Sequence, residues 1–593
     1  PAELEAALAA LTEQEKFVGF SRYDALNRPV RLTAPHTSDM PASHIRMQYD
    51  EEGLLNRVET NVRGEIRDGR PAWNVFVSRI VYNAKGMRTR IDYGNGTSTL
   101  YEYDPLTFRL VRLLIRRDET KFPGDRPDPP SDGWPGSHVQ NLHYTYDAVG
   151  NVTHVRDDAQ QTVFFRNKRV DPDASYTYDA LYRLIEASGR EHLGQAGAPP
   201  APHSFADAPR AGLGWAANDG KAMGRYTETY VYDAAGNMLE MRHRGTDPAH
   251  PGWKRRFVYE EPGLIEDGSN GSGSGTNNRL SRVVTGDDAS AADSFIYDAH
   301  GNLLRLPHLG GTHPDANMHW DAQDRLRRID LGGGGTVYYA YDADGRRIRK
   351  VWVKSPGRME ERIDFGGFEL YRRRNGAGET TLERESLHVM AGQQRIALIE
   401  TRTVDTEGTD PAPPRMIRYQ YGNHLGSVGL ELDEQAQIIS YEEYTPYGST
   451  AYQAVRSETE TPKRYRYTGK ERDEESGMYY HGARYYIPWL ARWASADPAG
   501  VNTDATNLFV YVDGNPITYH DPTGNDKESG FWKEVVYGDF HEGESTWTGT
   551  IANIGVGLIP YVGQAADARD TAAAAKGVWK NPTSGGAWLN LAG

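Results

Sequence analysis

The 593-residue chain contains no cysteine, which excludes disulfide bonds and zinc–thiolate sites and leaves its compartment open. It also lacks an apolar run of about 18 residues, the length a membrane-spanning helix needs. The N-terminal stretch PAELEAALAALTEQEKF is charged and amphipathic and does not read as a signal peptide. If the protein leaves the cell, we therefore expect some route other than this segment to export it.

The chain has no excess of basic residues: it contains 67 Lys and Arg and 82 Asp and Glu residues, which gives a formal net charge of −15. A net charge of this sign argues against a nucleic-acid-binding surface over the whole molecule. The sequence shows no P-loop, zinc motif or convincing Ser/His/Asp set, and the spacing of His308 and His313 is weak evidence for a metal. We expect no cofactor, no metal ion and no external substrate.

Tyrosine, in contrast, is abundant, and it recurs in a Tyr-Asp pattern. The chain has 36 tyrosines, while hydrophobic residues make up only 38%. A ring with a polar tip suits a sheet with one dry and one wet face, and the regular aromatic spacing favours a folded chain over an acidic disordered one. The pattern occurs at Tyr23, Tyr49, Tyr82 (followed by Asn), Tyr103, Tyr146, Tyr178, Tyr232, Tyr297, Trp320 (followed by Asp) and Tyr341.

Each repeat predicts a β-hairpin. In the repeat at Tyr146, the tyrosine ends a strand, Asp147 opens the turn by accepting hydrogen bonds from the amides ahead, and Gly150-Asn151 supplies left-handed residues. A single hairpin is only marginally stable in water, so the units should stack into one twisted sheet that coils to hide its edges. The alternatives are separate β domains or a propeller with blades of about 40–50 residues, which the irregular spacing disfavours.

The aromatic-rich stretch 465–524 carries two Asp-Pro-x-Gly tetrapeptides, Asp497–Gly500 and Asp521–Gly524. Its alternation of aromatics with Gly, Pro and Asn predicts short strands and tight turns. By themselves the tetrapeptides are simply turn formers. If the fold brings the two carboxylates within hydrogen-bond reach, however, they would share a proton and could act as general acid and general base.

The phrases GMYYHGARYYIPWLARWASADPAG and NLFVYVDGNPITYHDPTG in this stretch resemble the core signature that ends the shell of Rhs/YD-repeat proteins, above all the C component of insecticidal toxin complexes. The segment IDYGNGTSTLYEYDPLTFRL (residues 91–110) resembles the B component. The resemblance implies an all-β fold: a YD-repeat spiral β-sheet shell with a core plug and a short α-rich C-terminal segment.

The resemblance also implies a division of the chain. We expect an N-terminal helix or linker over residues 1–20, the YD-repeat shell over 21–362, the end of the shell over 363–464, an autoproteolytic core over 465–524, and a C-terminal cargo segment over 525–593.

Relatives with two such tetrapeptides cut themselves as aspartyl proteases, which implies an activity for this chain. Asp497 and Asp521 are the expected acid–base pair, with Asp504 as a competing partner for Asp497. Arg492 matches an arginine of the signature and is expected to fix a carboxylate or stabilise an oxyanion. The cut is expected within Gly524-Asn525-Asp526, after Asn525.

The resulting interpretation is a toxin-delivery shell that encloses its own C-terminal segment as cargo. A missing N-terminal half of the shell or a B-type component would complete it, together with an injection machine. The alternative is a YD-repeat cell-surface adhesion or carbohydrate-binding module, which tyrosines exposed on loops would favour. His424 could be read as catalytic, but a histidine in a strand–turn phrase is more often structural.

Overall fold

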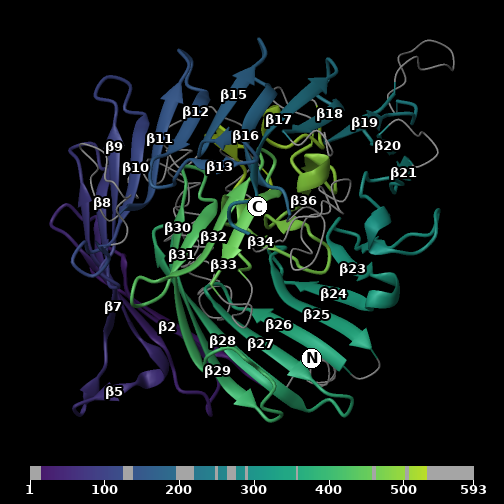
Figure 1. The fold of residues 1–593 in the computed structure, drawn as a ribbon. Coiled ribbons are helices and arrows are strands. Elements are labelled where there is room, and N and C mark those ends of the chain that lie inside the picture. The colour runs from purple at the N-terminus through teal and green to yellow at the C-terminus, as the bar shows by residue number, and fades with distance from the viewer. Residues whose placement is uncertain are drawn as a thin grey trace, which may run out of the picture.

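The computed structural model describes residues 15–123, 138–194, 219–246, 252–263, 276–286, 292–355, 358–456, 463–500, 507–525 and 527–529. Nearly all regular structure in these ranges is antiparallel β, arranged as two large sheets around a small core domain (Figure 1). The all-β shell predicted from the sequence is therefore confirmed. Most of the predicted N-terminal helix and of the α-rich C-terminal segment lies outside the described residues.

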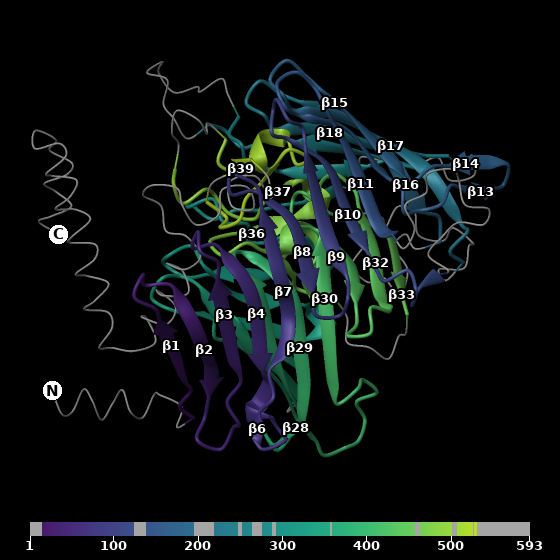
Figure 2. The ribbon, with the colours of Figure 1, turned by 90° about the vertical axis from the view of Figure 1, so that its left-hand side faces the viewer.

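Sheet one has 17 strands, and each pairs with the strands before and after it in this series (Figure 2). It starts at residue 18, inside the segment expected to be a linker. Two short hairpins, β5 (Ile66–Arg67) with β6 (Arg70–Pro71) and β13 (Val163–Phe165) with β14 (Lys168–Val170), project from it. Its strands are β1 (Val18–Tyr23), β2 (Pro29–His36), β3 (His44–Tyr49), β4 (Leu55–Asn61), β7 (Asn74–Tyr82), β8 (Arg88–Tyr93), β9 (Ser98–Tyr103), β10 (Leu110–Arg116), β11 (His138–Tyr146), β12 (Val152–Asp157), β15 (Asp173–Tyr178), β16 (Leu184–His192), β17 (Met223–Tyr232), β18 (Met238–Gly245), β19 (Trp253–Val258), β20 (Arg282–Thr285) and β21 (Ala292–Ser294).

Sheet two is a second meander of 12 strands. The division expected between residues 362 and 363 falls inside one of its strands, β26, because the meander continues through that point. Its strands are β22 (Met318–Trp320), β23 (Leu326–Asp330), β24 (Thr336–Tyr341), β25 (Arg347–Ser355), β26 (Arg358–Asp364), β27 (Phe368–Arg374), β28 (Thr380–Ala391), β29 (Gln394–Asp405), β30 (Arg415–Gly422), β31 (Val428–Leu432), β32 (Ile438–Tyr444) and β33 (Thr450–Val455).

The turn of each repeat is built around its aspartate. Asp147 Oδ1 accepts hydrogen bonds from the amides of Gly150 (2.7 Å) and Asn151 (2.8 Å). Gly150 has a φ of +111°, the left-handed region that glycine tolerates. Asn151 is not left-handed as expected; instead its Nδ2 donates to Asp147 Oδ2 at 2.8 Å. The asparagine therefore locks the turn through its side chain.

In most repeats the tyrosine ties its hairpin to the preceding one. Its hydroxyl donates, over 2.7–3.0 Å, to the carbonyl of the residue that begins the return strand of the previous hairpin. Each such bond contributes about 0.5–1.5 kcal/mol net. These pairs are Tyr49 with Pro29, Tyr82 with Leu55, Tyr103 with Arg88, Tyr146 with Leu110, Tyr178 with Val152, Tyr232 with Leu184, Tyr259 with Met238, Tyr341 with Leu326, and Tyr444 with Val428.

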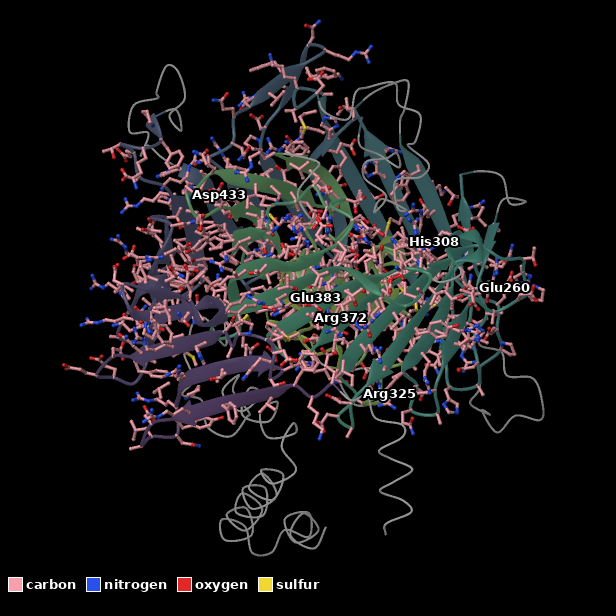
Figure 3. All side chains as sticks on the ribbon, turned by 90° about the horizontal axis from the view of Figure 1, so that it is seen from below. Glu260, His308, Arg325, Arg372, Glu383 and Asp433 are labelled. Atoms are coloured by element: carbon pink, nitrogen blue, oxygen red, sulfur yellow. The ribbon has the colours of Figure 1, made fainter. Side chains whose placement is uncertain are left out.

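The inner faces of the two sheets meet through aromatic rings and ion pairs. Phe76 of β7 stacks on Tyr419 of β30 at a centroid distance of 5.4 Å, and Arg190 of β16 pairs with Glu443 of β32. Charged side chains also pair within each sheet. Figure 3 labels Arg372 and Glu383, which join β27 to β28 at 2.8 Å.

The core domain lies between the sheets, in yellow in Figure 1. A buried charge cluster fixes it to sheet two: Arg347 reaches Asp473 (2.8 Å) and Glu471 (2.5 Å), and Lys350 reaches Asp473 (2.8 Å). Buried charges persist only when paired in this way. The domain contains strands β34 (Glu471–Arg472), β35 (Tyr479–Tyr480), β36 (Tyr485–Ile487), β37 (Arg492–Trp493) and β38 (Tyr519–His520). Strand β38 pairs with β39 (Glu528–Ser529), which lies beyond residue 524, the expected end of the core. The described 3-10 turns are η1 (Val62–Gly64), η5 (Pro307–Leu309), η6 (Gly332–Gly334), η7 (Tyr467–Gly469), η8 (Pro488–Leu490) and η9 (Val512–Gly514).

Replacing Tyr146 by phenylalanine tests the tie between hairpins. The variant keeps the ring and loses the hydroxyl that donates to Leu110, so its unfolding midpoint in urea should fall by an amount equivalent to about 0.5–1.5 kcal/mol. Tyr182→Phe is the matched control, because that ring is 49% exposed at a turn tip. Equal midpoints for Tyr146→Phe and Tyr182→Phe would contradict the proposed role.

Candidate active site

Both Asp-Pro-x-Gly tetrapeptides form the turns expected of them. In the first, the Gly500 amide donates to the Asp497 carbonyl at 3.0 Å, and the Ala499 amide donates to Asp497 Oδ1 at 2.9 Å. In the second, Asp521 Oδ1 accepts from the Gly524 amide at 2.7 Å. Each turn leaves the Oδ2 atom of its aspartate available for another partner.

One arginine joins the two turns. Arg484 Nη2 lies 2.9 Å from Asp497 Oδ2 and 3.4 Å from Asp521 Oδ2, so the two carboxylates converge on a single nitrogen. Arg484 Nε donates to the Gly524 carbonyl. The guanidinium is buried and lies 4.1 Å from the ring centroid of Trp493. Two carboxylates and a peptide carbonyl thus share one cation, and of these groups Asp497 is the one that is partly exposed to solvent.

The second turn is held by backbone packing against the loop that precedes Arg484. The Ala483 amide donates to the Thr523 carbonyl at 2.9 Å. Gly524 has a φ of +82°, and a Cβ there would approach the Arg484 amide to 2.9 Å. Glycine is needed at 524 for both reasons, and this close contact sets the position of the carbonyl that Arg484 binds.

Two further residues brace the turn. His481 Nδ1 donates to the Asp521 carbonyl at 2.6 Å, and Lys470 Nζ donates to the Pro522 carbonyl at 2.5 Å. Burial holds the pKa of His481 well below its usual value, which keeps the ring neutral. These contacts fix Asp521 without using its carboxylate.

Burial dominates the electrostatics of the site. It raises the pKa of Asp521 to about 6, although Arg484 and the amides of Gly524 and Thr523 oppose the rise. Burial also lowers the pKa of Arg484, against the pull of Asp497 and Asp521. A carboxyl group with a pKa near 6 can hold a proton at mildly acidic pH and donate it, which is what a general acid requires.

The structure places the remaining predicted residues as follows. Arg492 does not point to either aspartate: its Nη2 donates to the Asn278 carbonyl at 2.8 Å, and its guanidinium lies 4.9 Å from the Phe509 ring centroid. Asn525 is exposed where the chain leaves the buried turn. Asp504 and Asp526 lie outside the described residues.

Sequence reasoning missed Arg484, Lys470 and His481. Arg484 opens the RYY phrase that carries the family resemblance, and Arg492 is the next arginine of the same phrase, so the resemblance itself points to both. The spacing does not show whether Arg484 or Arg492 contacts the aspartates. Arg484 stands 37 residues before Asp521 in the sequence, and the two side chains meet only in the folded domain.

His424 and His308, two of the histidines singled out in the sequence, have structural contacts. His424 Nε2 donates to the Ile517 carbonyl at 2.7 Å, and His308 Nε2 donates to the Ser476 carbonyl at 3.0 Å. Burial lowers the pKa of each ring to about 4. Within the described ranges, no group of three or more His, Cys, Asp or Glu residues could hold a metal ion.

No family model matches the chain. Among curated proteins, toxin subunit YenC1 of Yersinia entomophaga is 32% identical over 527 residues, which cover 88% of this chain and 48% of that protein. Toxin protein Tse5 of Pseudomonas aeruginosa is 25% identical over 546 residues, covering 81% and 36%. The chain spans about half the length of YenC1 and a smaller share of Tse5.

Solved structures of toxin complexes share the fold. The crystal structure of TcdB2-TccC3 matches with a TM-score of 0.68 at 30% identity, over 88% of this chain and 22% of that one. The Tc holotoxin pore of Photorhabdus luminescens gives a TM-score of 0.68 at 30% identity, with the same coverage. Similarity in sequence and fold over most of the chain shows that this protein belongs to the Rhs/YD-repeat family of toxin shells, alongside the C subunits of insecticidal toxin complexes.

Proposed function

We propose that the chain is the wall and processing domain of a toxin-delivery shell, and that its core domain cuts the chain next to the second Asp-Pro-x-Gly turn. The observation that carries the proposal is the single guanidinium of Arg484, which contacts Asp497, Asp521 and the Gly524 carbonyl together. A structural ion pair would need only one of these partners. A polarised peptide carbonyl between two carboxylates is the arrangement that acid–base hydrolysis of that peptide requires.

The proposed reaction is hydrolysis by water. Asp497 takes a proton from a water molecule as its oxygen bonds to the scissile carbonyl carbon. Arg484 stabilises the negative charge that develops on the carbonyl oxygen. Asp521, in the protonated form that burial favours by raising its pKa to about 6, gives its proton to the leaving nitrogen as the C–N bond breaks.

Two neighbouring bonds are candidates for the cut. The carbonyl bound by Arg484 is that of Gly524, which favours cleavage between Gly524 and Asn525. The family resemblance favours the next bond, after Asn525. The two cuts leave fragments that begin with Asn525 or Asp526, so the mass of the small fragment identifies the bond.

The partners follow from the same proposal. The cargo is the C-terminal segment that begins at the cut, held by the shell until delivery. A further part of the shell, from upstream sequence or a B-type component, and an injection machine would complete the assembly, since the chain spans about half of YenC1. We propose that the complex is secreted or injected. In the described part of the chain no helix is long and apolar enough to cross a bilayer.

The alternative of an adhesion module receives less support. Tyrosines exposed on loops would favour an adhesion module. The repeat tyrosines instead end strands and bond to the neighbouring hairpin, as Tyr146 does with Leu110.

Wild-type protein should separate under denaturing conditions into a large fragment and a tail of about 7 kDa. Asp497→Asn and Asp521→Asn should each leave the 66.2 kDa chain intact, because the base or the acid is lost. Intact mass spectrometry measures this directly. An uncut wild-type chain, or cut variants, would overturn the proposal.

Replacement of Arg484 and replacement of Arg492 should have different effects on the rate of cleavage. Arg484→Lys removes the fork that spans both carboxylates and the Gly524 carbonyl, and should slow cleavage by about 10²–10³-fold. Arg492→Lys is the matched control, because that guanidinium contacts Asn278 and Tyr259, and it should cleave at the wild-type rate. Pulse–chase analysis of chains made by cell-free translation gives the rates. Loss of cleavage in Arg492→Lys alone would reverse the assignment.

The rate of cleavage should fall as the pH rises through about 6. Asp521 must be protonated to act as the acid, and its pKa of about 6 means that the protonated form disappears above that pH. A pH jump applied to freshly translated chains, followed by quantification of the small fragment, gives the profile. A rate that increases across this range would show that Asp521 is not the acid.

A further inference from the structure

His243 of β18 lies buried between two glutamates from neighbouring strands of sheet one. Its Nδ1 is 3.0 Å from Glu228 Oε1 on β17, and its Nε2 is 2.9 Å from Glu191 Oε2 on β16. The side chains of His243 and Glu191 are each 1% exposed, and that of Glu228 is 5% exposed. The proposed cleavage uses none of these groups.

The geometry indicates that the histidine ring carries a positive charge. A carboxylate oxygen only accepts hydrogen bonds, so each ring nitrogen needs its own proton to donate to one. A histidine that donates from both nitrogens is an imidazolium cation. The cluster of His243, Glu191 and Glu228 therefore places one positive charge between two negative charges in the interior of the wall. Buried charges persist only when they are paired in this way.

Two aromatic rings pack against the imidazolium. Tyr226 of β17 stacks on it with a centroid distance of 5.2 Å and an interplanar angle of 18°, and Trp253 of β19 does so at 5.4 Å and 14°. Both strands are hydrogen-bonded neighbours of β18, so the three rings span three adjacent strands (Figure 1). The face of an aromatic ring attracts a cation, and this attraction is lost when the histidine becomes neutral.

The two glutamates set the pH at which the ring loses its charge. Burial alone would lower the pKa of His243, but Glu191 and Glu228 outweigh burial and raise it to about 9. Because this pKa lies above the ordinary value of about 6.5, the cluster stabilises the fold fully below about pH 6.5, and the stabilisation is lost as the pH rises through about 9. Above that pH, one ring nitrogen presents a lone pair to a carboxylate, and two buried carboxylates lose their counterion.

The tyrosines and the arginine that pack around the cluster keep their charge state over this range. Burial raises the pKa of Tyr226 and Tyr230 on β17 well above the usual value, and it does the same for Tyr447, which packs on Tyr230 from the turn after β32. Arg255 of β19 lies 4.0 Å from the centroid of the Trp253 ring, and an arginine is not deprotonated in proteins. The histidine is therefore the group of the cluster that changes charge near pH 9.

We propose that His243, Glu191 and Glu228 form a latch that holds strands β16–β19 together while the ring is charged and releases them in alkaline solution. The core domain is affected as well, because Arg255 Nη1 donates to the Trp489 carbonyl in η8 at 3.3 Å. Release of the latch loosens the wall and its contact with the core domain at the same place. The latch does not depend on self-cleavage.

Nuclear magnetic resonance of the purified chain, labelled with carbon-13 in its histidine rings, tests the charge state. Of the 18 histidines, one ring should stay in the imidazolium form at about pH 8 and titrate near pH 9. Glu191→Gln removes one of the two negative charges and should lower the midpoint of that signal by at least about one pH unit. Glu186→Gln is the matched control, because it removes the same charge from an exposed position of the same strand, and it should leave the midpoint unchanged.

Hydrogen–deuterium exchange of the backbone amides tests the release. From about pH 7 to about pH 10, the protection of β16–β19 should fall by about 10–100-fold relative to β7–β10, which serve as an internal reference in the same sheet. In Glu191→Gln the fall should come at lower pH. The proposal is overturned if no histidine ring titrates above about pH 8, if Glu191→Gln and Glu186→Gln have the same midpoint, or if both sets of strands keep equal protection. If Glu191→Gln does not fold, the titration and the exchange of the wild-type chain still decide the outcome.

Discussion

The bond between a repeat tyrosine and the preceding hairpin is the interaction on which the shell depends. Tyr146, Tyr178 and their counterparts each reach back to the first residue of the previous return strand. A hairpin that is marginal alone thereby gains a fixed neighbour, and stability accumulates from nearest-neighbour contacts along the wall. This explains how a chain with modest hydrophobic content builds sheets of 17 and 12 strands. Tyrosine is suited to the position because its ring packs at the surface of the sheet while its hydroxyl crosses to the next unit.

The sheets in turn position the residues that are proposed to cleave the chain. Buried ion pairs from Arg347 and Lys350 fix the core domain on sheet two, and the domain buries Arg484 between two aspartates. A buried cation is costly unless it is fully compensated, so the arginine and the two carboxylates stabilise one another. The same burial raises the pKa of Asp521, and a carboxyl group with a raised pKa suits the proposed role of general acid.

Much of this could be predicted from the sequence, because the information in a hairpin is local. The Tyr-Asp pattern predicted the strand ends, and Asp147 forms the turn as expected. The prediction that Asn151 has a left-handed backbone was wrong, because the sequence does not distinguish an asparagine that bonds through its side chain from one with a left-handed backbone. Arg484 was missed because its partners lie far along the chain.

The central claim is that water, activated between Asp497 and Asp521, breaks a peptide bond beside Gly524. Translating the chain in heavy-oxygen water and measuring the mass of the large fragment tests this most directly. The account predicts one heavy oxygen atom in the new carboxylate at Gly524 or Asn525, and none when Asp497 is replaced by asparagine. A fragment without the label, or a chain that stays whole in heavy-oxygen water, would contradict it.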